Sequence, residues 1–249
     1  MIAQPWDDLP AVEYVDLSHV ISDGMPVFPG LERPRVMAFV DHEQSRPLYQ
    51  GEAEFHISKL ELVGNTGTYL DTPFHRYREG RDLSEIPLDS VAGCPRVVLD
   101  GTVGPDRAVS LEADEALLAE NAVLVRTGWD ARWGTDAYWE PGPYISPDAL
   151  ELLLRARPML VGVDFWNVDD TDDPSRLVHT RLLAEEILIV EHLLQSRRAA
   201  DVGLPLLCGT ASHRLGRLVP RARLRRSAGL MALGLAGQVP TQPGAAPSG

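Results

Sequence analysis

Short apolar runs bounded by turn-forming residues recur along the chain, and they constrain its fold more than any other feature. The sequence contains 21 glycines and 20 prolines, so turns are frequent and strands must be short. Five apolar runs are predicted to be strands: Val12–Val20, Ile57–Val63, Arg96–Asp100, Ala122–Thr127 and Met159–Asp164.

Helices are predicted between the later strands. Ser146 precedes a proline, an acid and the run ALELLLRA, which is typical of a capped helix start. A second helix is predicted over Leu177–Glu186, followed by the β-branched run Ile187–Glu191, which we interpret as a buried strand. Because helices and strands interleave, the fold class is predicted to be α/β or α+β.

Composition and length favour one domain. The chain has 249 residues, of which 44% are apolar and 24% charged, so it can bury a substantial core. No internal repeat divides it, and we expect a single domain over residues 1–237. Residues 238–249 read QVPTQPGAAPSG, a segment with too few apolar side chains to fold, and are predicted to form a disordered tail.

Charge and cysteine content exclude several classes of protein. The 36 acidic and 23 basic residues give a net charge of -13, which argues against a nucleic-acid partner. The region from Gln195 to Arg226 is an exception, with eight arginines and one acid. This region fits either a solvated or interface strand, or a surface for an anionic substrate or acidic partner.

Location is inferred from what the sequence lacks. Cys94 and Cys208 belong to no paired-thiol motif, and no apolar stretch is long enough to span a membrane. The N-terminal residues lack the pattern of a secretory signal. We therefore expect a reduced, cytoplasmic protein.

The segment from Gly64 to His75, GNTGTYLDTPFH, carries the strongest chemical signal. Two glycines indicate a tight turn after a predicted strand. If the residues that follow are extended, their spacing places Tyr69, Asp71 and His75 on one side of the chain. Such a group is either a functional site or only a satisfied pair of histidine and acid on the surface.

This segment resembles the signature His-x-Gly-Thr-His-x-Asp-x-Pro-x-His of the cyclase family, which includes bacterial kynurenine formamidase, isatin hydrolase and several aromatic polyketide cyclases. The signature aligns with residues 65–75 without a gap. Further matches cover nearly the whole chain: Val15–His19, Gly24–Gly30, Leu124–Trp129, Leu160–Asp164, and the pair His179 and Glu191. The resemblance implies a swivelling β/β/α domain, with a small barrel-like sheet flanked by helices, in a homodimer or homotetramer.

Two departures from the signature affect the expected chemistry. In the metal-dependent relatives the first two signature histidines, the aspartate, and the distal histidine and glutamate bind one or two divalent ions. Asn65 and Tyr69 replace those two histidines here. A neutral amide and a protonated phenol are weak ligands at neutral pH, so a two-metal centre is not expected.

The remaining residues favour an acid–base mechanism without a cofactor. In this interpretation His75 removes a proton, Tyr69 and Asn65 steady an enolate, and three further residues orient the network or supply the acid: Asp71, His179 and Glu191. The reaction would be a cyclisation or dehydration of a small natural-product intermediate, such as an aromatic polyketide.

Two alternatives stay open. One zinc or manganese ion, bound by Asp71, His179 and Glu191, would support an amidohydrolase of the kynurenine formamidase or isatin hydrolase type. A non-catalytic relative would retain the pocket and only bind a ligand.

Other residues are assigned by position alone. Asn65, Phe28, Trp129, Phe165 and Trp166 are candidates for binding the substrate. The aromatic residues between Trp129 and Tyr144 fit either framework packing or a pocket for a flat substrate. The acidic residues of 169–173 do not match a calcium loop and are expected to form a solvated turn. His19 is expected to be a surface or core histidine.

Overall fold

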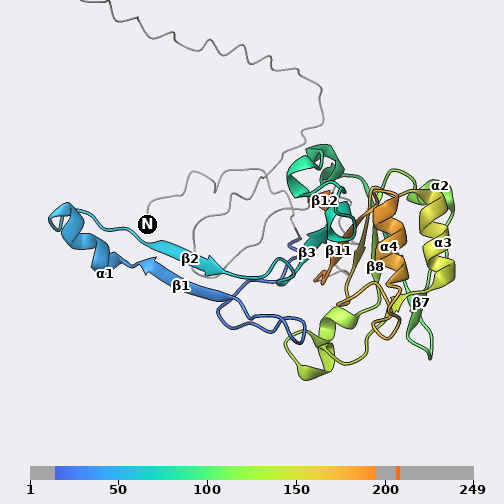
Figure 1. Ribbon diagram of the computed structural model, residues 1–249, viewed down its shortest axis with the longest axis horizontal. Helices are drawn as coiled ribbons and strands as arrows, with labels where there is room; N and C mark the ends of the chain where they lie inside the picture. The colour runs from blue at the N-terminus through green and yellow to red at the C-terminus, as the bar shows by residue number, and fades with distance from the viewer. Residues whose placement is uncertain (1–14, 195–205, 208–249) are drawn as a thin grey trace, which may run out of the picture.

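The computed structural model describes residues 15–194 and 206–207 (Figure 1). Helices and strands interleave within them, so the predicted mixed α/β class is confirmed. The predicted tail at 238–249, Cys208 and nearly all of the arginine-rich region lie outside the described residues.

A five-stranded mixed sheet forms the centre of the fold. Its strand order is β3 (Tyr69–Asp71), β11 (Leu188–Glu191), β10 (Leu160–Val163), β8 (Ala122–Arg126) and β5 (Arg96–Asp100). Strands β5, β8, β10 and β11 are parallel, and β3 runs antiparallel to β11. In the described part of the chain β3 and β5 form the two edges and do not pair, so these five strands do not close into the barrel-like sheet that we expected.

Apolar side chains cover both faces of this sheet, because successive residues of a strand point to opposite sides. On one face the strands pack against helices α3 (Pro147–Ala156) and α4 (Leu177–Ala184), which lie side by side in Figure 1. On the other face Leu124, Leu160 and Val190 pack around Cys94. The predicted cap of α3 is confirmed, since Ser146 Oγ accepts a hydrogen bond of 3.2 Å from the backbone N–H of Ala149.

Smaller elements surround the central sheet. One further sheet contains β6 (Thr102–Val103), β7 (Ala108–Ser110) and β9 (Tyr144–Ile145), and another pairs β4 (Ala92–Cys94) with β12 (Leu206–Leu207). A short helix, α2 (Glu115–Leu118), packs beside α3. The described loops around the sheet contain the 3₁₀ turns η2 (Pro73–His75), η3 (Leu83–Glu85), η4 (Leu88–Ser90), η5 (Trp129–Arg132) and η6 (Asp136–Tyr138).

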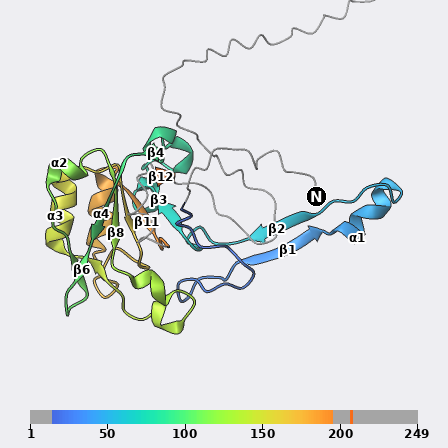
Figure 2. The ribbon, with the colours of Figure 1, turned by 180° about the vertical axis from the view of Figure 1, so that it is seen from behind.

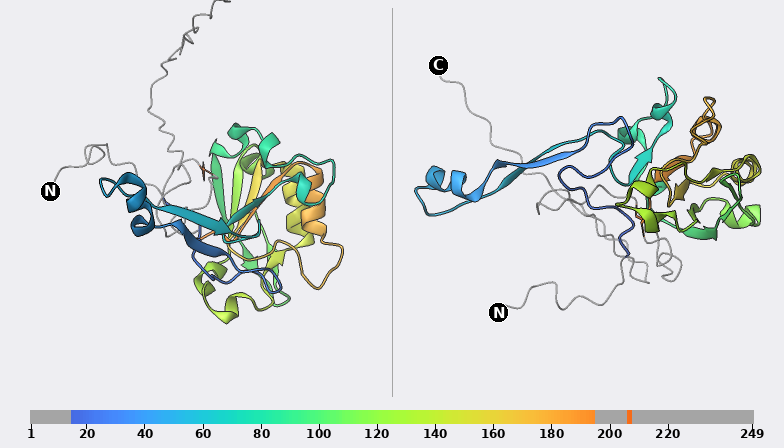
Figure 3. Two further views of the ribbon diagram at one scale, coloured as in Figure 1. Left: turned by 60° about the vertical axis from the view of Figure 1, so that its left-hand side comes forward. Right: turned by 90° about the horizontal axis from the view of Figure 1, so that it is seen from below.

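Residues 35–61 form an arm that projects away from this body (Figures 2 and 3). The arm is an antiparallel hairpin of β1 (Arg35–Val40) and β2 (Ile57–Glu61). Its tip carries α1 (His42–Ser45) and the 3₁₀ turn η1 (Arg46–Tyr49). Val36 is the buried residue of β1, whereas most of the strand faces solvent. We call residues 35–61 the hairpin arm.

The strand predicted at Val12–Val20 is wrong for its described part, residues 15–20. Two backbone N–H groups of this segment bind side chains instead of a neighbouring strand. Ser18 donates to the carboxylate of Asp16, and His19 donates to Thr68 Oγ1 at 3.0 Å. Across the ranges that the structure describes, no helix is long and apolar enough to cross a membrane.

Candidate metal centre

Strands β3 and β11 position the first three residues of the candidate site. Tyr69 pairs with Glu191 across the two strands, and Asp71 pairs with Ile189. Tyr69 and Asp71 are two residues apart in a strand, so they share one face of the sheet. Gly67 precedes them with φ +67, a backbone conformation that favours glycine.

His75 reaches the site by a different route from the one that its spacing predicted. The chain is extended only as far as Thr72, and Pro73 then starts the 3₁₀ turn η2, which ends at His75. The prediction that an extended segment aligns His75 with Tyr69 and Asp71 is therefore wrong in its geometry. The turn still brings His75 Nδ1 to 3.3 Å from Asp71 Oδ1.

His179 lies in the first turn of α4 and completes a convergent group. Its Nε2 is 3.5 Å from Asp71 Oδ2 and 3.6 Å from Glu191 Oε1. One ligand atom from each of Asp71, His75 and His179 lies within 4.8 Å of the others. The group of potential metal ligands thus contains His75, whereas the set we expected from the resemblance contained Glu191 in its place.

Glu191 is instead held by hydrogen bonds on both of its oxygens. Oε2 accepts a bond of 2.5 Å from the Tyr69 hydroxyl, and Oε1 accepts one of 2.8 Å from the backbone N–H of Val168. Asn65 also hydrogen-bonds the Tyr69 side chain. Asn65, Tyr69 and Glu191 therefore form a chain of hydrogen bonds beside the convergent group.

Burial and neighbouring charges change the pKa values of these groups. Burial favours neutral His179, but its hydrogen bond to Asp169 and the nearby carboxylate of Asp71 outweigh it and raise its pKa to about 10. Burial raises the pKa of Glu191 to about 7, although the charge of His179 opposes the change. Burial, together with the charges of Glu191 and Asp71, raises the pKa of Tyr69 well above its ordinary value, so this phenol keeps its proton at neutral pH. Burial lowers the pKa of His75.

The chemistry of these residues fits a divalent cation. Asp71 is 6% exposed, and among the described residues its buried Oδ2 accepts no hydrogen bond. Buried carboxylate oxygens normally have a partner, and an ion would supply one here. Carboxylate and imidazole are ligands that both zinc and manganese accept. The structure therefore places a candidate metal centre at Asp71, His75 and His179.

Comparison with known proteins places the chain in a family. Residues 15–170 match the family model described as "Putative cyclase", which covers more than half of the chain. The chain belongs to the cyclase family. A relative from Salinibacter ruber, named "Kynurenine formamidase", is 29% identical over 200 residues, which make up 77% of this chain and 89% of the relative.

Solved structures share the cyclase-family fold. Isatin hydrolase A from Labrenzia aggregata, bound to benzyl benzoate, matches with a TM-score of 0.58 and 21% identity over 74% of this chain and 81% of that one. A protein from Bacillus stearothermophilus, described as a "predicted metal-dependent hydrolase", matches with a TM-score of 0.54 and 21% identity over 72% and 81% of the two chains. At these identities the likeness concerns the fold alone.

Asp169 is a site residue that sequence reasoning missed in this cyclase-family chain. We expected it in a solvated turn, but it is 3% exposed and its Oδ2 lies 2.7 Å from His179 Nδ1. The expectation fits Asp172, whose side chain is 80% exposed. Residues 169–173 contain four aspartates, and nothing in their spacing shows which one is buried. The sequence alone therefore does not distinguish Asp169 from its more exposed neighbours.

The predicted substrate-binding aromatic residues are divided between the surface and the core. The rings of Phe28 and Trp166 lie 5.4 Å apart, and Phe28 is 37% exposed. Phe165 is fully buried and belongs to the core cluster around α3 and α4. Trp129 donates to the carbonyl of Tyr138 and stacks against Arg132, so it contributes to the framework of its loop.

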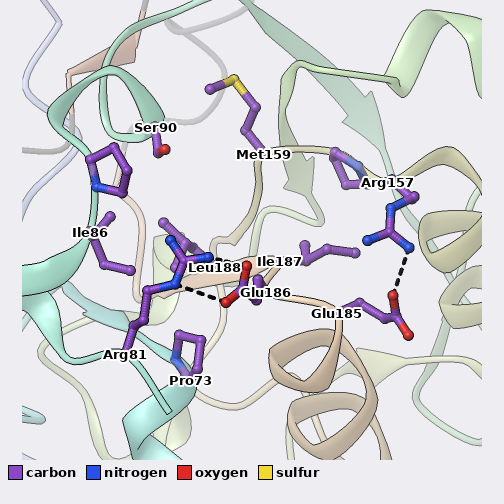
Figure 4. A pocket seen from close by; sticks show the side chains of 12 residues that line it. Pro73, Arg81, Ile86, Ser90, Arg157, Met159, Glu185, Glu186, Ile187 and Leu188 are labelled. Atoms are coloured by element: carbon purple, nitrogen blue, oxygen red, sulfur yellow. Dashed lines mark hydrogen bonds and ion pairs between the residues drawn. The ribbon is translucent and has the colours of Figure 1, made fainter.

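A separate cavity of about 310 Å³ opens near the amino-terminal ends of β10 and β11 (Figure 4). Met159 and Leu188 contribute to its apolar lining. Its charged side chains are already paired, since Arg81 contacts Glu186 and Arg157 contacts Glu185 at 2.6 Å. Among the ligands of the candidate metal centre, none lines this cavity.

Proposed function

We propose that the protein is a hydrolase that uses one divalent ion to cleave the amide bond of a small N-formyl or cyclic amide substrate. The observation that carries this proposal is the convergence of Asp71, His75 and His179 around a buried carboxylate oxygen that accepts no hydrogen bond in the described part of the chain. The relative named "Kynurenine formamidase" and the structures named isatin hydrolase support amide chemistry.

The ligand set suits this reaction. A zinc or manganese ion held by Asp71, His75 and His179 would polarise the substrate carbonyl and lower the pKa of water. His75 is the most accessible of the three, with its side chain 35% exposed, whereas the side chains of Asp71 and His179 are at most 7% exposed. We therefore place the substrate on the side of His75.

The neighbouring hydrogen-bonded chain supplies proton transfer. Glu191, whose pKa is raised to about 7, can both accept and release a proton near neutral pH. Tyr69 keeps its proton and is suited to donate a hydrogen bond, either to Glu191 as here or to an oxygen that becomes negative during the reaction.

Metal analysis and turnover together test this proposal. We expect about one zinc or manganese ion per chain, and hydrolysis of isatin or of an N-formyl aromatic amine that a chelator abolishes and added metal restores. Asp71→Asn should lose both the ion and the activity, whereas Asp148→Asn, at an exposed position of α3, should retain both. Full hydrolytic activity in the chelated protein would overturn the proposal.

An acid–base cyclisation or dehydration without metal is the second candidate. The chain from Asn65 through Tyr69 to Glu191, with its 2.5 Å hydrogen bond, favours it. In that case the chelated protein would still convert a polyketide-like substrate, and His75→Ala would abolish turnover. If the protein only binds its ligand, neither the wild type nor His75→Ala would show turnover.

A further inference from the structure

Asp169 joins the candidate metal centre to the start of helix α4. Its Oδ1 accepts hydrogen bonds from the backbone N–H groups of Val178, at 2.6 Å, and His179, at 3.3 Å. The residue at the N-cap of α4, Arg176, has a left-handed backbone conformation and its side chain makes no capping hydrogen bond. Asp169 therefore satisfies the free N–H groups of this helix from another segment of the chain.

The second oxygen of the same carboxylate holds the imidazole of His179. Asp169 Oδ2 lies 2.7 Å from Nδ1, and both side chains are at most 4% exposed. An ionised carboxylate can only accept, so Nδ1 carries the proton. Nε2 is then the nitrogen that faces Asp71 and Glu191, at 3.5 and 3.6 Å. One carboxylate thus fixes the backbone and the ring orientation of His179, and it keeps a proton on Nδ1 whether the ring is charged or neutral.

Asp169 also contacts the segment that carries the other imidazole. Arg76 directly follows His75, and its guanidinium lies 3.6 Å from Asp169 Oδ2. The end of η2 and the first turn of α4 are therefore held to the same buried acid. This arrangement restrains the two histidines of the convergent group relative to each other.

We propose that Asp169 is a positioning residue, which orients His179 so that Nε2 is available to the metal ion and thereby sets the affinity of the centre. The effect on metal affinity rests on the proposed function, whereas the orientation of the ring does not. Acceptors behind metal-bound histidines act in this way in proteins generally.

Asp169→Asn separates the two roles of the carboxylate. The amide retains an oxygen that can cap α4, but its NH₂ group cannot accept a hydrogen bond from Nδ1–H, so the ring of His179 loses the acceptor that orients it. We expect the Kd for zinc to rise by about 10- to 100-fold, measured by competition with a chromogenic chelator. The metal-free variant should melt at a lower temperature, because the neutral amide removes the charge that raises the pKa of His179 and pairs with Arg76, so the Kd is measured at a temperature at which both proteins are fully folded. Asp172→Asn, an exposed acid of the same loop, is the matched control and should leave the Kd unchanged.

A spectroscopic measurement reports on the ring independently of metal and activity. In metal-free protein labelled with ¹⁵N-histidine, we expect a downfield, slowly exchanging Nδ1–H resonance from His179. The resonance should be lost in Asp169→Asn and retained in Asp172→Asn. If Asp169 acted on stability alone, Asp169→Asn would lower the melting temperature but leave this resonance and the zinc Kd of the folded protein unchanged.

The outcomes distinguish the two proposals. An unchanged zinc Kd in Asp169→Asn overturns the positioning role even if the wild type binds one ion. A wild type that binds no zinc or manganese overturns the proposed function, and the resonance alone then decides whether Asp169 orients His179. Absence of that resonance from the wild type overturns the positioning role in either case.

Discussion

At the scale of single residues, the bond between Tyr69 and Glu191 links stability to pH. Glu191 is 1% exposed, and Tyr69→Phe removes the donor to its Oε2. An unpaired buried acceptor costs about 1–3 kcal/mol. The lost bond also raises the pKa of Glu191 above its value of about 7, so ionised Glu191 becomes less favourable in the folded state. We expect Tyr69→Phe to lower the free energy of unfolding of chelated protein more at about pH 8.5 than at about pH 6.

Tyr77→Phe provides a matched control for this pH dependence. The Tyr77 hydroxyl donates a hydrogen bond of 2.6 Å to the backbone carbonyl of Thr180, an acceptor that does not ionise. Its loss should destabilise the protein by a similar amount at both pH values. If urea denaturation gave the same loss at both pH values for Tyr69→Phe as well, Glu191 would not be the responsible group.

Because two histidines are buried, we expect the folded protein to lose stability in acid. Burial lowers the pKa of His19 to about 4 and that of His192 to about 3, so both are neutral in the folded protein at neutral pH. The unfolded chain takes up these protons below its ordinary histidine pKa of 6.5. The stability that these two neutral histidines contribute is therefore complete above about pH 6.5 and decreases as the pH falls toward 4, by up to ~1.4 kcal/mol per pH unit for each histidine.

His19→Phe tests this account. The His19 ring stacks on Trp133 at 3.5 Å, and within residues 15–194 and 206–207 its buried Nε2 has no hydrogen-bond partner. Phenylalanine retains the stacked ring and removes one proton-binding site. We expect a shallower loss of melting temperature between about pH 6.5 and 4.5. His42→Phe, on the exposed hairpin arm, should leave the slope unchanged, and an equal slope in His19→Phe would contradict the prediction.

At the scale of elements, the cap of α3 is a local feature with a measurable effect. Ser146 Oγ accepts from Ala149, and α3 buries Leu150 and Leu153 against the central sheet. Ser146→Ala should lower the free energy of unfolding by about 0.5–2 kcal/mol, measured by urea denaturation. Ser110→Ala, at an exposed position of β7, is the control. No loss in Ser146→Ala would mean that water or a backbone group caps the helix equally well.

The same locality explains which elements could be predicted from the sequence. Helix α3 and the core strands β5, β8 and β10 carry their signals in their own residues, as a cap or as an apolar run. Strand β3 has three residues and depends on pairing with Glu191, which is 122 positions away from Tyr69. Residues 15–20 are apolar enough to be predicted as a strand, but the N–H groups of Ser18 and His19 donate to side chains instead of to a neighbouring strand.

For the candidate site, the sequence predicted which residues take part but not how they are arranged. The signature identified Tyr69, Asp71 and His75, and the wider resemblance identified His179 and Glu191; the structure brings all five together. Which of them converge depends on turns that residue types do not specify, such as the 3₁₀ turn that brings His75 to Asp71. The inward turn of Asp169 depends on α4, which needs its cap. The geometry of the site therefore depends on packing between segments that are distant in the sequence, and the spacing of residues does not determine it.

At the scale of the whole molecule, the hairpin arm is a thin projection (Figure 3), and it exposes apolar side chains. Phe39 is 65% exposed, Leu48 69% and Tyr49 52%. A two-stranded hairpin is marginally stable by itself, and exposed apolar groups of this kind mark interfaces. The homodimer or homotetramer that we expected from the resemblance stays a prediction, and the arm is where we expect the contact.

Substitutions on the arm test this assembly. If the arms pack against a second copy, Phe39→Glu combined with Leu48→Glu buries two charges at the interface, which is costly without partners. We expect sedimentation equilibrium to show a dimer or larger assembly for the wild type and a monomer for the double variant, with the metal content unchanged. Glu43→Lys alters an exposed charge on the same arm and should leave the assembly intact. A wild type that sediments as a monomer, or a double variant that remains assembled, would exclude the arm as the interface.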